Sequence, residues 1–114
     1  METLAEFVGR LRKSIGCYCH LCKSGYFSLK KVNTEIKGRM GVFAYVLEKK
    51  RNGLFRVDIS EHIADRAAVK KLACEEKPKL MWGRPGVCFC VRKGSAGEDY
   101  QKAVKALRAV LLLR

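Results

Sequence analysis

The chain has 114 residues, 48% of them hydrophobic, which suits one domain with a modest core and is too little for two independent ones. This composition excludes a disordered basic tail. The formal net charge of +13 favours an anionic partner, such as nucleic acid, a ribonucleoprotein surface or an anionic membrane, because such a partner screens the self-repulsion of the chain.

The sequence shows no signal for secretion or membrane insertion. The N-terminal segment carries acids and lacks the apolar core of a signal peptide. The longest strictly apolar run near the C-terminus, residues 109–113, is far shorter than the roughly 20 residues of a membrane span. We therefore expect one cytoplasmic domain over residues 1–114 without a membrane span, and its six cysteines as reduced thiols.

The first predicted element is an amphipathic helix over about residues 4–15. Thr3 and Glu6 form a capping-box pattern, and apolar residues then recur at helical spacing up to Ile15. Gly16 suits the end of the helix because glycine readily adopts the left-handed conformation. Three basic residues fall away from the apolar stripe: Arg10, Arg12 and Lys13.

A cysteine-histidine cluster follows this helix: Cys17, Cys19, His20 and Cys22. Thiolates and imidazoles are the ligands that zinc prefers, so the cluster is a candidate site for a structural zinc ion. Its spacing differs from that of a zinc knuckle and favours structural cysteines that bind no metal, because no second CxxC pair follows. Cys88 and Cys90 could complete a zinc site only if their strand lies beside this segment.

From Gly25 onward the pattern changes to short β-type runs, and we expect antiparallel strands within residues 25–32, 41–48 and 53–59. Val42–Leu47 is apolar on both faces, which predicts the most buried strand of the sheet. The dipeptide Asn52-Gly53 is a strong signal for a two-residue hairpin turn between the second and third strands.

Basic residues gather on these strands and their turns. Such a run of charges is usually only solvated surface, but this group is large enough to follow a phosphate backbone. The candidate nucleic-acid-binding residues are Lys30, Lys31, Lys37, Arg39, Lys49, Lys50, Arg51 and Arg56.

Two helices and a strand are predicted in the rest of the chain. The first helix covers Ser60–Cys74, with Ser60 as its N-cap. Val87–Arg92 alternates large apolar residues with cysteines, as a buried strand does. A second capping box, Ser95–Glu98, begins the closing helix. Its apolar stripe, which includes Leu111, is widened by Leu112 and Leu113, which predicts a contact with a protein partner or a second copy, or else a frayed apolar tail.

Together these elements predict an α+β fold, namely a two-layer domain with an antiparallel sheet of three to four strands and helices packed on one face. The other sheet face would then be free, and small RNA-binding domains use such a face and its loops for contact. We therefore expect a non-catalytic RNA-binding protein, a component of a ribonucleoprotein particle, that binds structured RNA by phosphate contacts through a basic sheet surface and loops.

A family resemblance supports this expectation. The opening helix with Ala5-Glu-Phe7, the strand ending in Leu29-Lys-Lys31, and Val87–Lys93 before a closing helix resemble the small Alu-RNA-binding subunits of the signal recognition particle. The resemblance implies an α-β-β-β-α fold, a heterodimeric partner, and RNA contacts by four residues of this chain: Lys30, Lys31, Lys37 and Arg39. Residues 61–82 and the cysteine-histidine cluster have no counterpart in that family.

A second resemblance, to GIY-YIG nuclease domains, provides the alternative function. That family implies paired tyrosines, a catalytic arginine and a metal-binding glutamate, for which the order of elements offers Tyr45, Arg66 and Glu98. Phe55 stands where the second tyrosine is expected, so the resemblance implies a degenerate or weakly active nuclease. No other enzyme class is indicated, because neither a phosphate-binding glycine loop nor a G-x-S-x-G motif occurs. Apart from zinc, we expect no cofactor.

Overall fold

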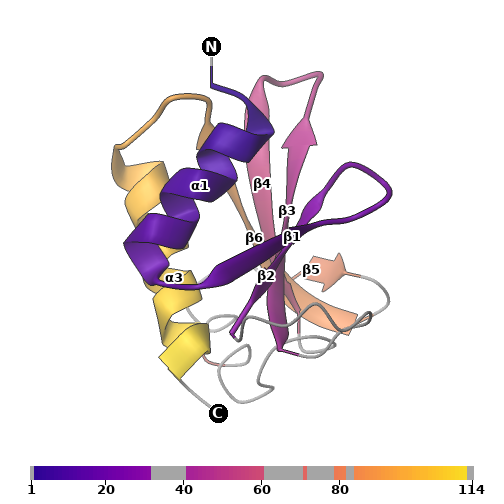
Figure 1. Cartoon of the computed structure of the whole chain (residues 1–114), viewed down its shortest axis with the longest axis vertical. Helices are drawn as coiled ribbons and strands as arrows, with labels where there is room; N and C mark the ends of the chain where they lie inside the picture. The colour runs from indigo at the N-terminus through magenta and orange to yellow at the C-terminus, as the bar shows by residue number, and fades with distance from the viewer. Residues whose placement is uncertain (1, 32–40, 61–70, 72–78, 82–83, 113–114) are drawn as a thin grey trace.

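The computed structural model describes residues 2–31, 41–60, 71, 79–81 and 84–112 (Figure 1). The described strands form one sheet in the order β1-β2-β3-β4-β6-β5, and every neighbouring pair is antiparallel. In chain order the elements are α1 (Leu4–Ile15), β1 (Tyr18–Leu21), β2 (Phe27–Lys30), β3 (Val42–Lys49), β4 (Leu54–Ser60), β5 (Lys79–Met81), β6 (Arg84–Arg92) and α3 (Glu98–Leu112).

The predicted α+β class, with helices on one face of an antiparallel sheet, is confirmed, but the described residues form six strands of the sheet rather than three to four. One unpredicted strand, β1, contains two of the four residues that were considered as metal ligands, Cys19 and His20. The other, β5, is three residues long and pairs with the start of β6. Ser60, the predicted N-cap of the helix over Ser60–Cys74, is the last residue of β4, and the rest of that helix lies outside the described residues apart from Lys71, which is helical.

The first helix is capped as its sequence predicts. Thr3 Oγ1 accepts a hydrogen bond from the Glu6 N–H, and the Glu6 carboxylate accepts one from the Thr3 N–H. Gly16 ends the helix in the left-handed conformation, at φ 77°. α1 is therefore fixed at both ends, with Phe7, Val8 and Leu11 buried against the sheet.

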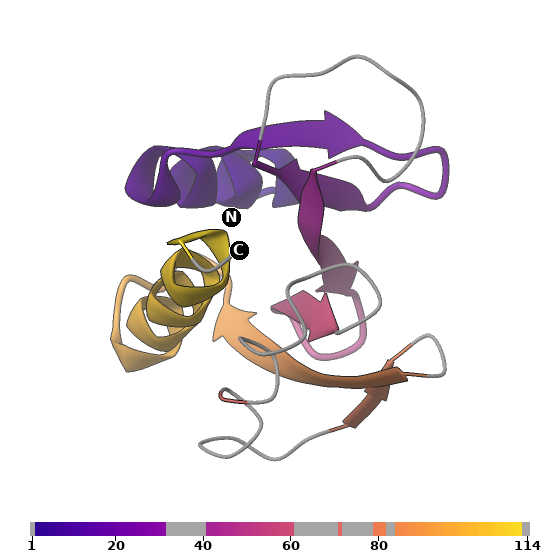
Figure 2. The ribbon, with the colours of Figure 1, turned by 90° about the horizontal axis from the view of Figure 1, so that it is seen from below.

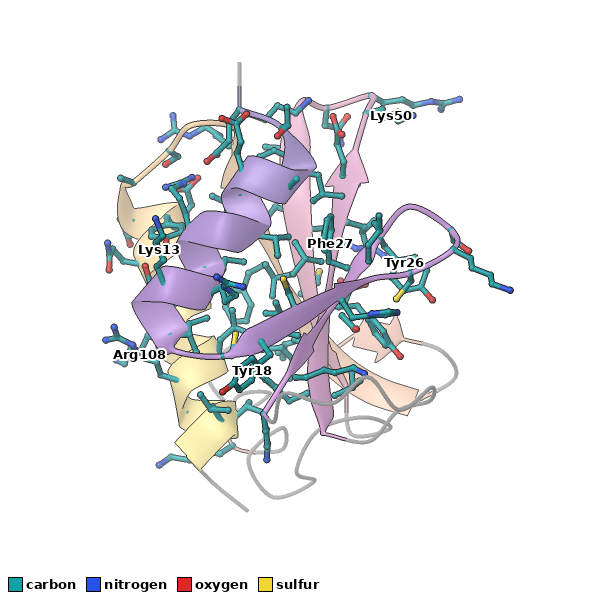
Figure 3. All side chains as sticks on the ribbon, viewed as in Figure 1. Lys13, Tyr18, Tyr26, Phe27, Lys50 and Arg108 are labelled. Carbon is teal, nitrogen blue, oxygen red and sulfur yellow. The ribbon has the colours of Figure 1, made fainter. Side chains whose placement is uncertain are left out.

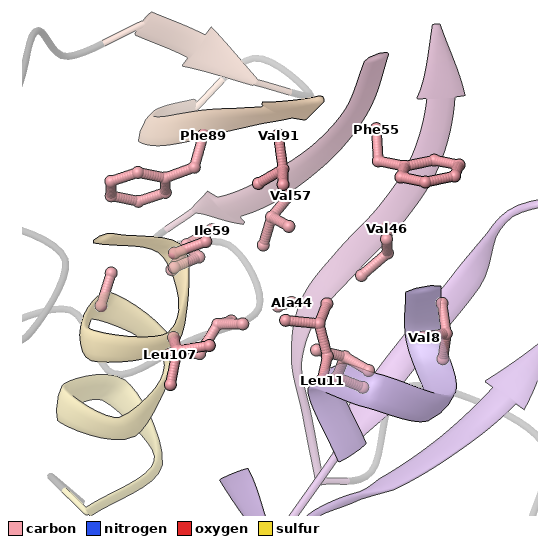
Figure 4. Close-up of a cluster of buried hydrophobic side chains, with 14 of the residues drawn as sticks. Val8, Leu11, Ala44, Val46, Phe55, Val57, Ile59, Phe89, Val91 and Leu107 are labelled. Atoms are coloured by element: carbon pink, nitrogen blue, oxygen red, sulfur yellow. The ribbon is translucent and has the colours of Figure 1, made fainter. Parts of the chain in front are cut away.

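The core lies between the sheet and helices α1 and α3, which cover the same sheet face (Figures 2 and 4). Phe55, Val57 and Ile59 of β4 project into it, and their ladder partners on β6 are Val91, Phe89 and Val87. Paired residues of an antiparallel ladder project to the same face, so β4 and β6 present one continuous apolar surface. The Phe55 ring stacks on that of Phe7 with centroids 4.5 Å apart, which joins α1 to the sheet.

No helix among the described residues is long and apolar enough to cross a membrane. In α3, the half-buried Leu111 packs against the core, as expected for a residue of its apolar stripe, and the contact of this helix with a partner stays a prediction. The side chain of Leu112 and all of Leu113 lie outside the described residues.

Candidate nucleic-acid interface

The sheet face opposite the helices was expected to be free, but it is closed along part of its width. Ser28 of β2 is paired with Tyr45 of β3, and Tyr45 with Asp58 of β4, so these polar side chains form a row on that outer face. Ser28 is 3% exposed, Asp58 2%, and the neighbouring Lys30 only 4%. The prediction of an open basic surface on this sheet face is therefore wrong for these residues.

Two of the predicted basic residues, Lys30 and Arg56, lie on this outer face in settings that restrict them. Lys30 is almost completely buried, so little of its side chain is open to a ligand. Arg56 forms an ion pair with Asp58: Nη2 donates a hydrogen bond to Oδ2 at 2.9 Å, and Nε lies 2.8 Å from Oδ1 without making a hydrogen bond to it. The Arg56 charge is thus already matched inside the protein.

The loop after β2 is described only at its two ends. Lys31 is half-buried, and its backbone N–H donates a hydrogen bond to the Gly41 carbonyl at 2.7 Å. It also takes part in another interaction within the protein. Lys37 and Arg39 lie outside the described residues. Their part in the predicted basic set stays a prediction.

The tip of the β3–β4 hairpin carries the predicted basic residues that remain accessible: Lys49, Lys50 and Arg51. The ladder ends at the pair Lys49–Leu54, so the loop has four residues rather than the two that the Asn52-Gly53 signal predicts. The Asn52 N–H donates to the Lys49 carbonyl, and Gly53 closes the loop with φ 62°, a conformation that favours glycine. Lys50 and Arg51 are exposed, and Figure 3 shows Lys50 pointing away from the body of the protein.

The described carboxylates are largely engaged elsewhere. Glu2 binds Arg10, Glu48 binds Lys93, and Asp99 lies near Arg92, in addition to the Arg56–Asp58 pair. Glu6 belongs to the cap of α1. Within the described part of the chain, no carboxylate forms an ion pair with the three hairpin-tip cations. Lys50 and Arg51 are therefore exposed charges, with the half-buried Lys49 beside them, and no described carboxylate compensates them.

A further group of exposed basic residues lies on the helices and was not assigned a role from the sequence. These residues are Arg12 and Lys13 of α1, and Lys102, Lys105 and Arg108 of α3. The spacing of three between the α3 residues places them along one side of the helix. This spacing could have been recognised from the sequence, because the apolar positions between them already define the buried side of α3.

The predicted zinc ligands do not converge. Cys19 lies on the core face of β1, whereas His20, the next residue along the strand, projects to the outer face. Cys17 is buried, and this burial, together with the nearby Cys19, raises the pKa of its thiol to about 11, so it is a poor source of the thiolate that zinc needs. Cys22 is half-buried, with its Sγ 3.9 Å from the His20 carbonyl.

The later cysteines do not complete the cluster, because β6 pairs with β4 while β1 lies at the opposite side of the sheet. Cys88 and Cys90 project to the outer face of β6, opposite Asp58 and Arg56. Among the residues placed in the structure, no three cysteine, histidine or acidic side chains are grouped so that they could hold a metal ion.

The residues considered for nuclease chemistry are also separated. Tyr45 projects to the outer face of β3, whereas α3, which carries Glu98, packs on the opposite face. Phe55 is fully buried and stacked on Phe7. Arg66 lies outside the described residues. Among the described residues, Tyr45 and Glu98 thus lie on opposite sides of the sheet and do not form a common site.

No protein-family model, curated protein or solved structure matches this chain.

Proposed function

We propose that this protein is a non-catalytic RNA-binding protein, a component of a ribonucleoprotein particle, that holds structured RNA by its phosphates. The observation that carries the proposal is the hairpin tip, where Lys49, Lys50 and Arg51 present consecutive positive charges that no described carboxylate neutralises. In a chain of net charge +13, such a tip is a site at which a polyanion gains contacts without breaking internal ion pairs.

The distribution of aromatic residues supports phosphate contacts rather than base reading. Proteins that bind unpaired bases stack them on exposed aromatic rings. Tyr18, at 43% exposure, is the one large aromatic residue among those described that counts as exposed. Tyr26 and Tyr45 are half-buried and pack edge to face on each other, with centroids 5.3 Å apart. A folded RNA, whose bases are paired, therefore suits this surface better than a single strand.

The test is the affinity for a hairpin RNA of the double variant Lys50→Gln/Arg51→Gln. The variant Lys23→Gln/Lys71→Gln is a matched control, because it removes two other exposed positive charges and gives the same net charge. We expect the tip variant to bind about 10-fold more weakly, and the slope of log affinity against log salt to fall by about 2, as expected when two phosphate contacts are lost. The control should change both quantities much less.

Two results would contradict the proposal. One is an affinity of the unchanged protein for RNA that does not vary between low and high salt. The other is an equal loss in the tip variant and the control, which would mean that only total charge matters. A DNA duplex of the same sequence, measured in parallel, shows whether the 2′-hydroxyl groups and A-form shape of RNA contribute.

A further inference from the structure

The solvent-facing side of the helix layer carries a second basic surface, formed where α1 and α3 lie together. The two helices run in the same general direction over the sheet (Figure 1). Near their starts, the Glu2 carboxylate accepts a hydrogen bond from the Gly94 N–H at 3.0 Å. Further along, Ser14 Oγ lies 2.8 Å from the Tyr100 hydroxyl, and Arg108 donates two hydrogen bonds to the Ser14 carbonyl. Residues of both helices therefore share one surface.

This shared surface is basic beyond the first turn of each helix, and only Lys102, which lies near Glu98 and Asp99, has acidic neighbours along its helix. After Glu6, the sequence of α1 contains no acid, and after Asp99 the sequence of α3 contains none. The exposed cations on this stretch are Arg12, Lys13, Lys102, Lys105 and Arg108, which we call the helix-layer cations. Figure 3 shows Lys13 and Arg108 on the two helices, away from the hairpin tip that carries Lys50.

The helix dipoles account for only part of these charges. Cations in the last turn of a helix offset the partial negative charge of its C-terminal carbonyls, and Arg12 and Lys13 of α1 do so. The last turn of α3 has no basic residue in its described range, since Lys102, Lys105 and Arg108 all lie before it. Glu98 and Asp99 lie four and three residues before Lys102 and offset its charge, whereas the sequence of α3 has no acid three or four residues from Lys105 or Arg108. These two cations repel each other weakly along the helix, and a bound anion would screen them.

Arg108 is also held in place before any ligand arrives. Its Nε and Nη2 both donate to the Ser14 carbonyl, at 3.2 and 2.5 Å, which fixes the guanidinium at the C-terminal end of α1. Nη1 makes no hydrogen bond to a described residue, and the side chain remains exposed. A guanidinium fixed in this way can bind a phosphate with a smaller loss of side-chain entropy than a free one.

We propose that the helix-layer cations form a second phosphate-binding surface, so that one molecule of the protein bridges two segments of folded RNA. The inference rests on the proposed function, because it assigns a second contact to the same class of ligand. The hairpin tip joins the end of β3 to the start of β4, whereas the helix-layer cations belong to α1 and α3, the helices that cover one sheet face (Figure 2). Separate surfaces allow two duplex segments to be held at once.

A bridging assay tests this inference. One biotinylated RNA hairpin is immobilised, the protein is added, and the capture of a second, fluorescent hairpin is measured over a series of protein concentrations. The compared proteins are the unchanged chain, Lys13→Gln/Lys105→Gln, Lys50→Gln/Arg51→Gln and the control Lys23→Gln/Lys71→Gln. Glutamine is chosen because its helix propensity is close to that of lysine, so the variants should keep α1 and α3. Circular dichroism confirms the folding of each variant.

We expect the unchanged protein and the control to capture the fluorescent hairpin. Lys13→Gln/Lys105→Gln should still bind the immobilised hairpin through the tip, and its capture of the second hairpin should fall at least about 10-fold, as two phosphate contacts are lost. Capture that is unaffected by these two substitutions overturns the inference, including the case in which a dimer bridges the hairpins through two tips. If no protein binds the first hairpin, the proposed function itself fails, which is a distinct outcome.

Discussion

Asp99 in the first turn of α3 is the group whose titration should change the stability of the fold most visibly. Its Oδ1 accepts hydrogen bonds from Ser95 Oγ and the Tyr100 N–H, and its Oδ2 accepts one from the Arg92 N–H at 2.9 Å. These bonds, led by the one from Ser95, lower the pKa of Asp99 from 3.8 to about 2. The carboxylate thereby joins the end of β6 to the start of α3.

The size of the effect follows from the linkage between protonation and folding. A shift from 3.8 to about 2 corresponds to at most about 2.4 kcal/mol. Solvent screening around a side chain that is 22% exposed reduces this to about 1 kcal/mol. Because the pKa is lower in the folded state, this stabilisation is complete above pH 3.8 and is lost as the pH falls through about 2.

The prediction is tested with Asp99→Asn, measured by urea unfolding at several values between pH 7 and pH 2. We expect the variant to be less stable than the unchanged protein by about 1 kcal/mol near neutral pH, and the difference to shrink towards pH 2. Glu98→Gln is the matched control, since Glu98 occupies the same first turn and makes no hydrogen bond through its side chain to a described residue. A difference between Asp99→Asn and the unchanged protein that stays the same from pH 7 to pH 2 would refute the reasoning.

Three further predictions concern the core and the thiols. Phe55→Ala removes a fully buried ring stacked on Phe7 and should destabilise the fold by about 3–5 kcal/mol in urea unfolding; a loss below about 1 kcal/mol would show that the ring is not part of the core. At pH 8, Cys17, with a pKa of about 11, should react with iodoacetamide on the order of 100-fold more slowly than the exposed Cys90, as read by peptide mass spectrometry. Equal rates would contradict the burial of Cys17. Protein purified from zinc-supplemented medium should contain well under one equivalent of zinc by elemental analysis, because the cysteine-histidine cluster is divided between the two faces of β1.

The parts of the fold that depend on local signals could be predicted from the sequence. Thr3, Glu6 and Gly16 specify the ends of α1 through bonds within a few residues, and the structure has those bonds. The closing helix was also expected, and α3 begins at Glu98, the last residue of its predicted capping box. Such elements need no information from the rest of the chain.

The missed strands depend on partners that are distant in the sequence or on a competing interpretation. In β1, Cys19 and Leu21 alternate with Tyr18 and His20, but Cys19 and His20 were also considered as metal ligands. The pairing of this segment with β2 decides in favour of a strand. In β5, three residues are too few to show a periodicity, and only the pairing with β6 defines them as a strand.

The state of each predicted basic residue could not be predicted either, because burial is a property of the whole fold. Lys30 and Lys50 are both lysines beside β-type runs, yet the stem of Lys30 is buried and Lys50 is exposed. Only the pairing of Arg56 with Asp58 could have been predicted from the sequence. Opposite charges two residues apart on a strand lie on the same face and attract each other.

The position of β6 beside β4 bears on how the chain folds as it is made. Strands β1 to β4 pair with their neighbours in sequence, whereas Ser60 of β4 must wait for Gly86 before the next ladder can form. Closing that long connection costs entropy that the earlier hairpins do not. Until β6 emerges from the ribosome, Phe55, Val57 and Ile59 lie along an unpaired edge, the kind of surface through which incomplete chains aggregate. The yield of folded protein should thus depend more on the synthesis of the last third of the chain, which contains β6, than on the synthesis of the first two thirds.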